Sequence, residues 1–185
     1  MCSTADQTGP PRRGVSTVKV QILRLRGIEL ASAEAFYRSL GRGPTIGPQE
    51  TVLLARCGET SVGAVRLVWD QGVLVLRTMQ VHPNWQRRGV GTALLQALVR
   101  LLDDRECFCL PWDHLLAFYA ASGFAGVEAA MLPPFLQERL RRYQAAGHHT
   151  IGMRRPGRNA ASVDWNRSNA LRASPPGRQS LVTRP

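Results

Sequence analysis

The stretch from Val73 to Leu102, VLVLRTMQVHPNWQRRGVGTALLQALVRLL, decides the fold of this chain. Residues 73–81 are dense in β-branched and aliphatic side chains, as in a strand buried on both faces. Pro83 ends that strand, because proline has no N–H group to donate to a neighbouring strand. From Gly91 onward, leucines recur at helical spacing. The stretch therefore predicts a strand, a polar turn and an amphipathic helix.

The turn between strand and helix, residues 86–91, predicts an anion site. Gly89 and Gly91 allow a tight turn and a close approach of the backbone to a ligand. The first turn of a helix has unpaired amide donors and the positive end of the helix dipole, so phosphate or pyrophosphate fits it. Arg87 and Arg88 add positive charge. The turn lacks the motifs of dinucleotide folds and P-loops, and the alternative is a capped turn with exposed arginines.

Two motifs in this order resemble the GNAT superfamily of acetyl-CoA-dependent N-acetyltransferases. The segment QRRGVGTALL, residues 86–95, resembles motif A of that superfamily, whose pattern is Q/R-x-x-G-x-G/A after an apolar strand. The segment LAFYAASGF, residues 116–124, resembles its motif B, an aliphatic helix that ends in a tyrosine and is followed by Gly-Phe. The resemblance covers about residues 18–155.

The resemblance implies an α/β fold of the mixed α+β kind. It has a mixed, mostly antiparallel sheet of about six to seven strands, flanked by helices, with a central parallel pair that splays apart. Strands are expected at 18–25, 51–56, 62–70, 73–81, 106–110 and 149–154, and helices at 28–40, 91–102, 115–122 and 135–145. Because the helix between them is long enough for a crossover, strand 106–110 should lie parallel to strand 73–81.

Length and composition indicate one domain, residues 18–156, with a mobile leader at 1–17 and an Arg/Ser/Pro-rich disordered tail at 157–185. No apolar run reaches the ~20 residues of a membrane span, and no signal-peptide segment precedes the domain. We therefore expect a soluble cytoplasmic protein without a membrane partner; a homodimer is left open.

The net charge of +11 raises the question of nucleic-acid binding. Lys19 is the only lysine among 24 basic residues, which indicates a coding bias, and part of the excess lies in the terminal segments. Nucleic acid is therefore not the expected partner, although a basic nucleic-acid-associated protein stays as an alternative. Positive charge gives only a weak preference for acidic acceptors.

Cysteine spacing gives no disulfide framework. Cys107 and Cys109 would share one face of a strand, and His114 lies nearby in sequence. Because C-x-C lacks zinc-ribbon spacing, we expect buried reduced thiols and no metal.

The resemblance implies acetyl-CoA as cosubstrate. The backbones of Met79 and Val81 would hydrogen-bond its pantetheine arm, and backbone amides of the turn would hold its pyrophosphate. The expected members of this cradle are Gln86, Arg87, Arg88, Gly89, Val90, Gly91 and Thr92.

The implied reaction moves the acetyl group to a primary amine of a small molecule, amino acid or protein, by direct attack in a ternary complex. The N–H of Met79 would stabilise charge on the carbonyl oxygen. Tyr119 matches the motif B tyrosine that protonates the leaving sulfur in many members. The alternative for Tyr119 is core packing beside Phe118 and Phe124.

The general base is not identified by resemblance, because residues 73–81 contain no carboxylate. His114 ranks first, since it lies between the second parallel strand and the Tyr119 helix. Trp112 stands where many relatives have an asparagine, and it is expected to pack or to wall the acceptor pocket. The absence of a strand carboxylate also allows an acyl-CoA-binding module without turnover. The candidate bases are Asp70, His82, Glu106, Asp113 and His114.

Overall fold

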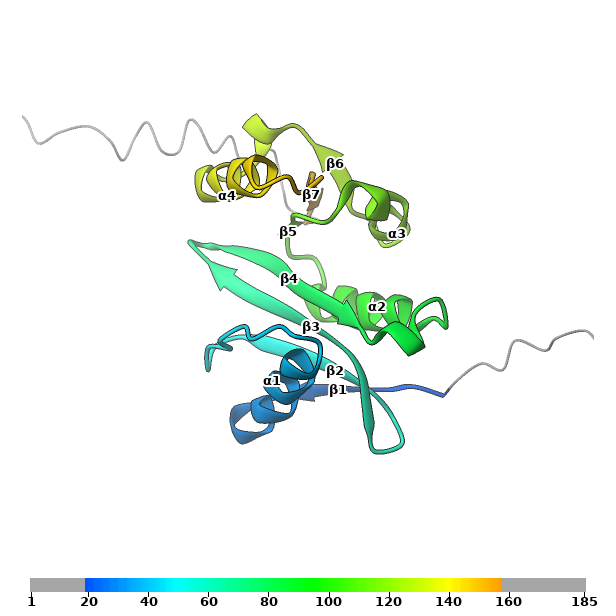
Figure 1. Ribbon diagram of the computed structural model, residues 1–185. Coiled ribbons are helices and arrows are strands. Elements are labelled where there is room, and N and C mark those ends of the chain that lie inside the picture. Colours follow the sequence, from blue (N-terminus) through cyan, green and yellow to red (C-terminus); the bar gives the residue numbers. More distant parts are fainter. Residues whose placement is uncertain (1–18, 158–185) are drawn as a thin grey trace, which may run out of the picture.

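The computed structural model describes residues 19–157, so the expected leader and nearly all of the expected tail lie outside the described range. A seven-stranded sheet runs in the order β1-β2-β3-β4-β5-β7-β6 (Figure 1). The strands are β1 (Gln21–Leu25), β2 (Thr51–Cys57), β3 (Thr60–Asp70), β4 (Val73–Val81), β5 (Cys107–Cys109), β6 (Ala125–Val127) and β7 (Gly152–Arg155). The α-helices are α1 (Leu30–Ser39), α2 (Val90–Leu102), α3 (Leu116–Ala120) and α4 (Pro134–Ala145). Single 3₁₀ turns are η1 (Gly27–Glu29), η2 (Pro83–Trp85), η3 (Asp113–Leu115) and η4 (Ala129–Met131).

The sheet is mixed and mostly antiparallel, which confirms the expected fold class. Strands β1 to β4 form an antiparallel meander, and β5 pairs with β4 in parallel. The final strand β7 lies between β5 and β6 and is antiparallel to both. Strand β6 was not among the expected strands, because Ala-Gly-Val is short and has a weak β propensity.

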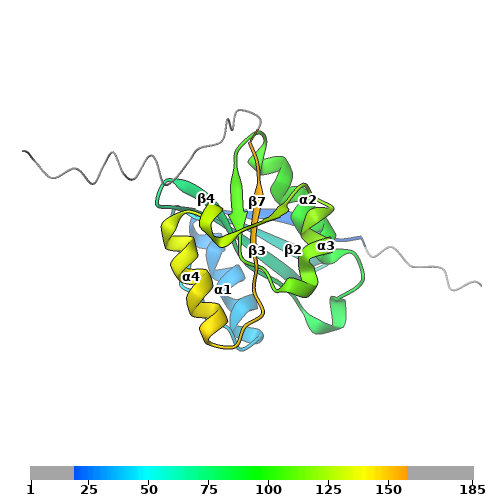
Figure 2. The same ribbon diagram turned by 90° about the horizontal axis from the view of Figure 1, so that it is seen from above.

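Apolar side chains of the strands point to both faces of the sheet in alternation, and helices cover both faces. In β2, Leu53 joins the core cluster under α2, whereas Val52 and Leu54 join the cluster under α1. In β4, Val73 and Val75 pack against α4. Helices α1 and α4 therefore cover one face and α2 and α3 the other (Figure 2). No helix within residues 19–157 has the length and apolar character needed to cross a membrane.

The central parallel pair is short. Strands β4 and β5 pair only from Leu74↔Cys107 to Leu76↔Cys109. Beyond Leu76, β4 continues to Val81 and pairs with β3 alone. The two strands thus part at the middle of β4, and this opening is where the cavities described below lie.

A bulge marks the same point of β4. The register of β3 with β4 passes from Arg77 directly to Gln80, so Thr78 and Met79 have no partner on β3. Thr78 has φ of 49°, a left-handed conformation that is uncommon for a threonine. The hydroxyl of fully buried Tyr37, on α1, donates a hydrogen bond to the carbonyl oxygen of Thr78 at 2.7 Å. Helix α1 therefore holds the bulge in place.

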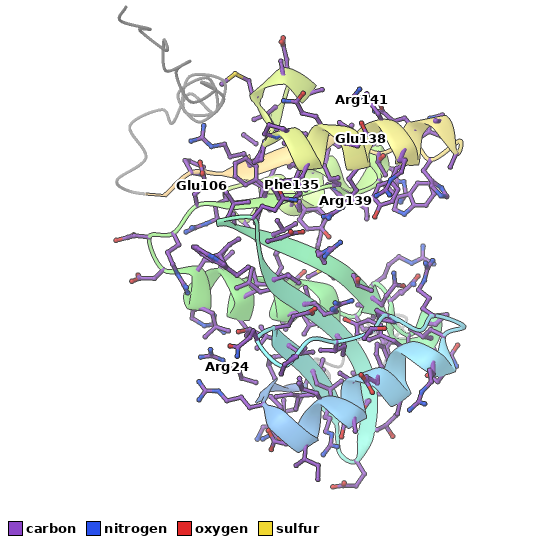
Figure 3. The ribbon with its side chains drawn as sticks, turned by 90° about the vertical axis from the view of Figure 1, so that its left-hand side faces the viewer. Arg24, Glu106, Phe135, Glu138, Arg139 and Arg141 are labelled. Carbon is purple, nitrogen blue, oxygen red and sulfur yellow. The ribbon has the colours of Figure 1, made fainter. Side chains whose placement is uncertain are left out.

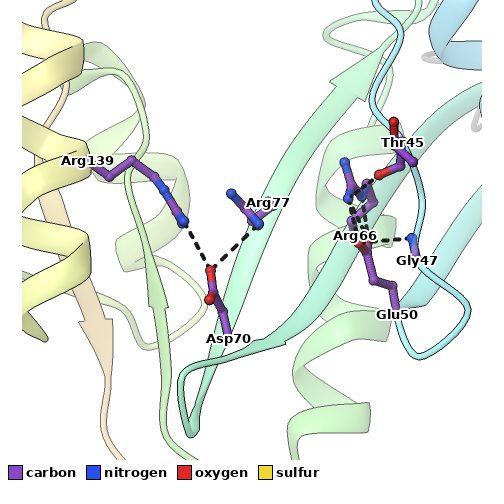
Figure 4. Close-up of polar contacts among 7 residues, drawn as sticks. All are labelled: Thr45, Gly47, Glu50, Arg66, Asp70, Arg77 and Arg139. Atoms are coloured by element: carbon purple, nitrogen blue, oxygen red, sulfur yellow. Dashed lines mark hydrogen bonds and ion pairs between the residues drawn. The ribbon is translucent and has the colours of Figure 1, made fainter.

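A buried ion pair joins the sheet to the loop after α1 (Figure 4). Arg66, on β3, is 6% exposed, and its guanidinium donates to both carboxylate oxygens of Glu50, each at 2.7 Å. It also donates to the carbonyl of Thr45 at 3.0 Å, while the N–H of Gly47 donates to Glu50. The charge of Arg66 is thus satisfied within the protein.

Candidate active site

A cavity of about 510 Å³ lies where β4 leaves β5. Its walls come from the end of β4, the turn after it, the start of α2, and η3 with α3. The expected site residues that line it are Met79, Val81, Gln86, Arg87, Gly89, Gly91, Thr92, His114 and Tyr119.

The turn before α2 fits a phosphate group. Gly89 is the N-cap of α2, has φ of 83° and offers no side chain to cap the first helical amides. A Cβ at Gly91 would lie 3.4 Å from Cζ of Phe118, so the backbone there is closely packed against α3. Arg87 lines the same cavity and carries a positive charge. Amide donors, the helix dipole and this charge together suit an anion.

Three members of the expected cradle have other contacts. The guanidinium of Arg88 lies over the ring of Trp85, 5.6 Å from its centroid, and Arg88 does not line the cavity. Val90 is 1% exposed and packs in the core, so only its backbone is available to a ligand. The side-chain amide of Gln86 donates to the carbonyl of Val81 at 3.2 Å and ties the turn to the strand.

Tyr119 both packs in the core and faces the cavities. It is 5% exposed and makes edge-to-face contacts with Phe118 at 5.1 Å and Phe124 at 6.0 Å between ring centroids. Its hydroxyl lies 3.8 Å from Sδ of Met79, a weak acceptor. Burial, and to a smaller extent Cys109, raises the pKa of Tyr119 above its ordinary value, so the phenol keeps its proton at neutral pH.

A second cavity, of about 330 Å³, lies beside the first. The two share Met79, Gln80, Trp112, Leu115, Tyr119 and Arg42 in their walls. The second is further lined by Tyr143, His148 and Thr150 from α4 and the segment before β7. Tyr119 therefore lies in the shared wall of two neighbouring cavities, one lined by the glycine turn and one by residues of α4.

Of the candidate bases, the structure brings only His114 to these two cavities. His114 lines the first cavity, is exposed, and has Nδ1 3.7 Å from the carboxylate of Asp113. The other candidates have separate partners. Asp70 pairs with Arg77 and Arg139, and Glu106 pairs with Arg154. The Asp113 carboxylate accepts a hydrogen bond from the backbone N–H of His114. The His82 side chain accepts one from the backbone N–H of Asn84.

His148 was not among the expected site residues. Its imidazole lines the second cavity and packs edge-on to Trp112 at 5.2 Å and to Tyr143 at 6.2 Å between ring centroids. The pair His148-His149 before the last strand was the available signal, but no periodicity tells where such a loop lies. Trp112 is 42% exposed and lines both cavities, so it forms a wall of the site.

The two cysteines of β5 lie in one core cluster, as the alternation predicts, and both are buried free thiols. Burial raises the pKa of Cys107 to about 12. Across the described range, 19–157, no three His, Cys, Asp or Glu side chains are grouped to hold a metal ion.

Similarity to known proteins bears on this site. Residues 48–125, which contain both motifs, match the sequence model of the acetyltransferase (GNAT) domain. A search of curated proteins finds no match. Among solved structures, the ribosomal-protein-S18-alanine N-acetyltransferase from Escherichia coli has a TM-score of 0.56 and 16% identity, over 78% of this chain and 98% of that one.

Two further similar structures contain coenzyme A. Rv2747 from Mycobacterium tuberculosis, in complex with CoA and NLQ, has a TM-score of 0.54 and 16% identity, over 72% of this chain and 97% of that one. N-acetylglutamate synthase from Neisseria gonorrhoeae, complexed with coenzyme A and N-acetyl-glutamate, has a TM-score of 0.53 and 19% identity, over 74% of this chain and 35% of that one. Residues 48–125, which contain both motifs, thus match a GNAT acetyltransferase domain, and the chain shares its fold with these solved structures.

Proposed function

We propose that the protein transfers an acetyl group from acetyl-CoA to a primary amine, by direct attack within a ternary complex. The observation that carries the proposal is the position of Tyr119 in the shared wall of two neighbouring cavities, one of which is lined by a glycine turn suited to phosphate. Acetyl-CoA supplies the thioester. Its pyrophosphate would lie on the amides from Gln86 to Thr92, with Arg87 beside them.

In the proposed reaction, a neutral amine in the second cavity attacks the thioester carbon. The new C–N bond forms, the C–S bond breaks, and the amine loses one proton while the departing sulfur gains one. The N–H of Met79 would stabilise the carbonyl oxygen, and its position in the unpaired bulge supports this role. The Tyr119 hydroxyl would give its proton to the departing sulfur. Its 3.8 Å contact with Sδ of Met79 supports this role, because it puts the hydroxyl beside the residue whose N–H would stabilise the carbonyl oxygen.

The amine proton needs an acceptor as well. His114 lines the first cavity, where we place acetyl-CoA, and so stays a candidate base. His148 lines the second cavity, where we place the amine, and is the better placed of the two. The described residues that line the two cavities include no carboxylate, which also leaves an acyl-CoA-binding module without turnover as the second candidate function.

Acetyl-CoA binding by the glycine turn is tested with a matched pair of variants. Gly89→Glu places a carboxylate at the proposed pyrophosphate site, and should weaken acetyl-CoA binding at least about tenfold through like-charge repulsion. Gly58→Glu, in the β2–β3 turn, is the control. Gly58 also has a positive φ, 57° against 83° for Gly89, and neither position has an atom within 4 Å of an added Cβ. The two variants therefore share backbone strain and added charge, and only Gly89→Glu puts the charge at the proposed pyrophosphate site.

Isothermal titration calorimetry measures both variants after circular dichroism has shown them folded. Equal losses of affinity in Gly58→Glu and Gly89→Glu would contradict the cradle. Tight acetyl-CoA binding by the wild-type protein, without turnover of any primary amine, would favour the binding module.

Tyr37 acts on the same chemistry from a distance, as a positioning residue. In Tyr37→Phe the carbonyl of Thr78 loses its hydrogen bond, which should cost about 1–2 kcal/mol of unfolding free energy. Because the bulge presents Met79, kcat should fall about tenfold while the KM for acetyl-CoA changes little. Steady-state kinetics beside urea unfolding separate the two effects. Loss of stability at unchanged kcat would leave Tyr37 a purely structural residue.

A further inference from the structure

A polar strip divides the α1/α4 face of the sheet. The core cluster under α1 and the cluster under α4 are separate, and the described core has no cluster that spans both helices on this face. Arg66 of β3 and Arg77 of β4 are direct cross-strand partners between them. Two like charges placed side by side on a sheet are unfavourable unless carboxylates or ligands compensate them.

The carboxylates of the strip compensate only part of this charge (Figure 4). Glu50 pairs with Arg66. Asp70, at the end of β3, is shared between Arg77 at 3.7 Å and Arg139 of α4 at 3.0 Å. The strip therefore holds one guanidinium more than it holds carboxylates.

Arg139 extends from α4 toward the sheet, as does Phe135, whereas Glu138 and Arg141 lie on the opposite side of the helix (Figure 3). Its side chain is 15% exposed, and its guanidinium lies over the Phe135 ring, 5.5 Å from the centroid. One nitrogen donates to Asp70, but the buried Nη1 has no hydrogen-bond partner. A buried donor without a partner is costly, and an added acceptor would satisfy it.

The excess charge lies next to the proposed acceptor cavity. A third cavity, of about 100 Å³, is lined by Arg77, Arg139 and Tyr143, and it shares Thr78 and Tyr143 with the second. Arg42, after α1, lines the second cavity itself, and no ion pair within residues 19–157 includes it. Neither cavity has an aspartate or glutamate in its described lining.

Burial of the Arg77 guanidinium favours an anion beside it. Desolvation lowers the pKa of Arg77, Arg139 lowers it further, and Asp70 opposes both. A bound carboxylate would offset that desolvation, and guanidinium groups bind carboxylates with two parallel hydrogen bonds.

We infer that the acceptor is a small amine that carries a carboxylate, with the carboxylate held by Arg77 and Arg139 and the amine lying near Tyr119. This inference rests on the proposed acetyl transfer and narrows its substrate. The second and third cavities, of about 330 and 100 Å³, suit a molecule of amino-acid size. Arg42 adds long-range attraction for such an anion.

The test compares matched acceptors that differ only in charge. We would measure kcat/KM for β-alanine against β-alaninamide and for L-alanine against L-alaninamide, with spermidine as a cationic amine. The carboxylate member of at least one pair should be better by about tenfold or more, through a lower KM.

Variants then assign this preference to the strip. Arg77→Gln leaves the contact of Arg139 with Asp70 in place while removing the excess charge, so it should raise the KM for the carboxylate acceptor about tenfold and erase the advantage over its amide. Arg77→Lys should retain most of the advantage. The control is Arg141→Gln, which removes the same charge from the exposed side of α4, where Arg141 pairs with Glu138.

The outcomes separate this inference from the function on which it rests. If neutral amides or spermidine are acetylated as well as the carboxylates, the carboxylate inference is wrong and acetyl transfer stands. The inference also fails if acetyl-CoA binds but no carboxylate amine is acetylated. If acetyl-CoA does not bind at all, the proposed function itself is rejected.

Discussion

Replacing Tyr119 by phenylalanine should lower kcat about 100-fold and leave the KM for acetyl-CoA within about threefold of wild type. The ring keeps its edge-to-face contacts with Phe118 and Phe124, so the fold should be retained. Only the hydroxyl is lost, and with it the proton for the departing sulfur. Steady-state kinetics on an acetylated amine measure the effect.

The leaving group provides an independent check on Tyr119. A thioester whose thiol has a lower pKa needs less protonation as it departs, so the loss caused by Tyr119→Phe should shrink with such a donor. The pH profile gives a further check. Because burial raises the pKa of Tyr119, its proton is retained as pH rises, and Tyr119 should cause no loss of kcat below about pH 10. A variant with wild-type kcat would make Tyr119 a packing residue only.

The largest effect on stability is expected from Glu50→Ala. This change leaves Arg66, a residue that is 6% exposed, without its carboxylate partner. An uncompensated buried charge costs about 3–5 kcal/mol of unfolding free energy. Urea unfolding at neutral pH, followed by circular dichroism, measures the shift in midpoint.

Two further variants test the reason for this loss. Glu138→Ala breaks an exposed ion pair with Arg141 and should change stability little. The double variant Glu50→Leu, Arg66→Met removes both charges, and should recover much of the stability lost in Glu50→Ala. If the double variant is as unstable as Glu50→Ala, then the buried charge is not the cause.

Residues whose environment is set by local pattern were predictable from the sequence. Strand β4 has the bounds that its aliphatic run indicates, and α2 begins one residue before the predicted start. Gly123, the glycine that follows the motif B helix, has φ of 84°, the left-handed conformation that glycine commonly adopts after a helix. Hydrophobic periodicity and glycine stereochemistry act within a few residues, so a short stretch of sequence is enough to predict their effect.

The rest of the candidate site depends on contacts between segments far apart in sequence. Arg139 meets Asp70 across 69 residues, and Tyr37 meets Thr78 across 41. The bulge at Thr78 is a property of the β3–β4 register, which no run of side chains specifies. Arg42 and His148 lie in loops, where hydrophobic periodicity gives no information, and they reach the second cavity only through the fold.

The place of β7 in the sheet bears on the order in which the protein folds. Strands β1 to β4 pair with their neighbours in sequence, so the meander needs only local contacts, which form quickly. Strand β5 and strand β6 have no contact across the sheet until β7 is inserted between them. During synthesis, we therefore expect the α3 and α4 half of the sheet to wait for residues 152–155 to leave the ribosome, while the other half is free to form earlier. We expect folding in two stages, with the cavity walls from α3 and α4 completed only in the second.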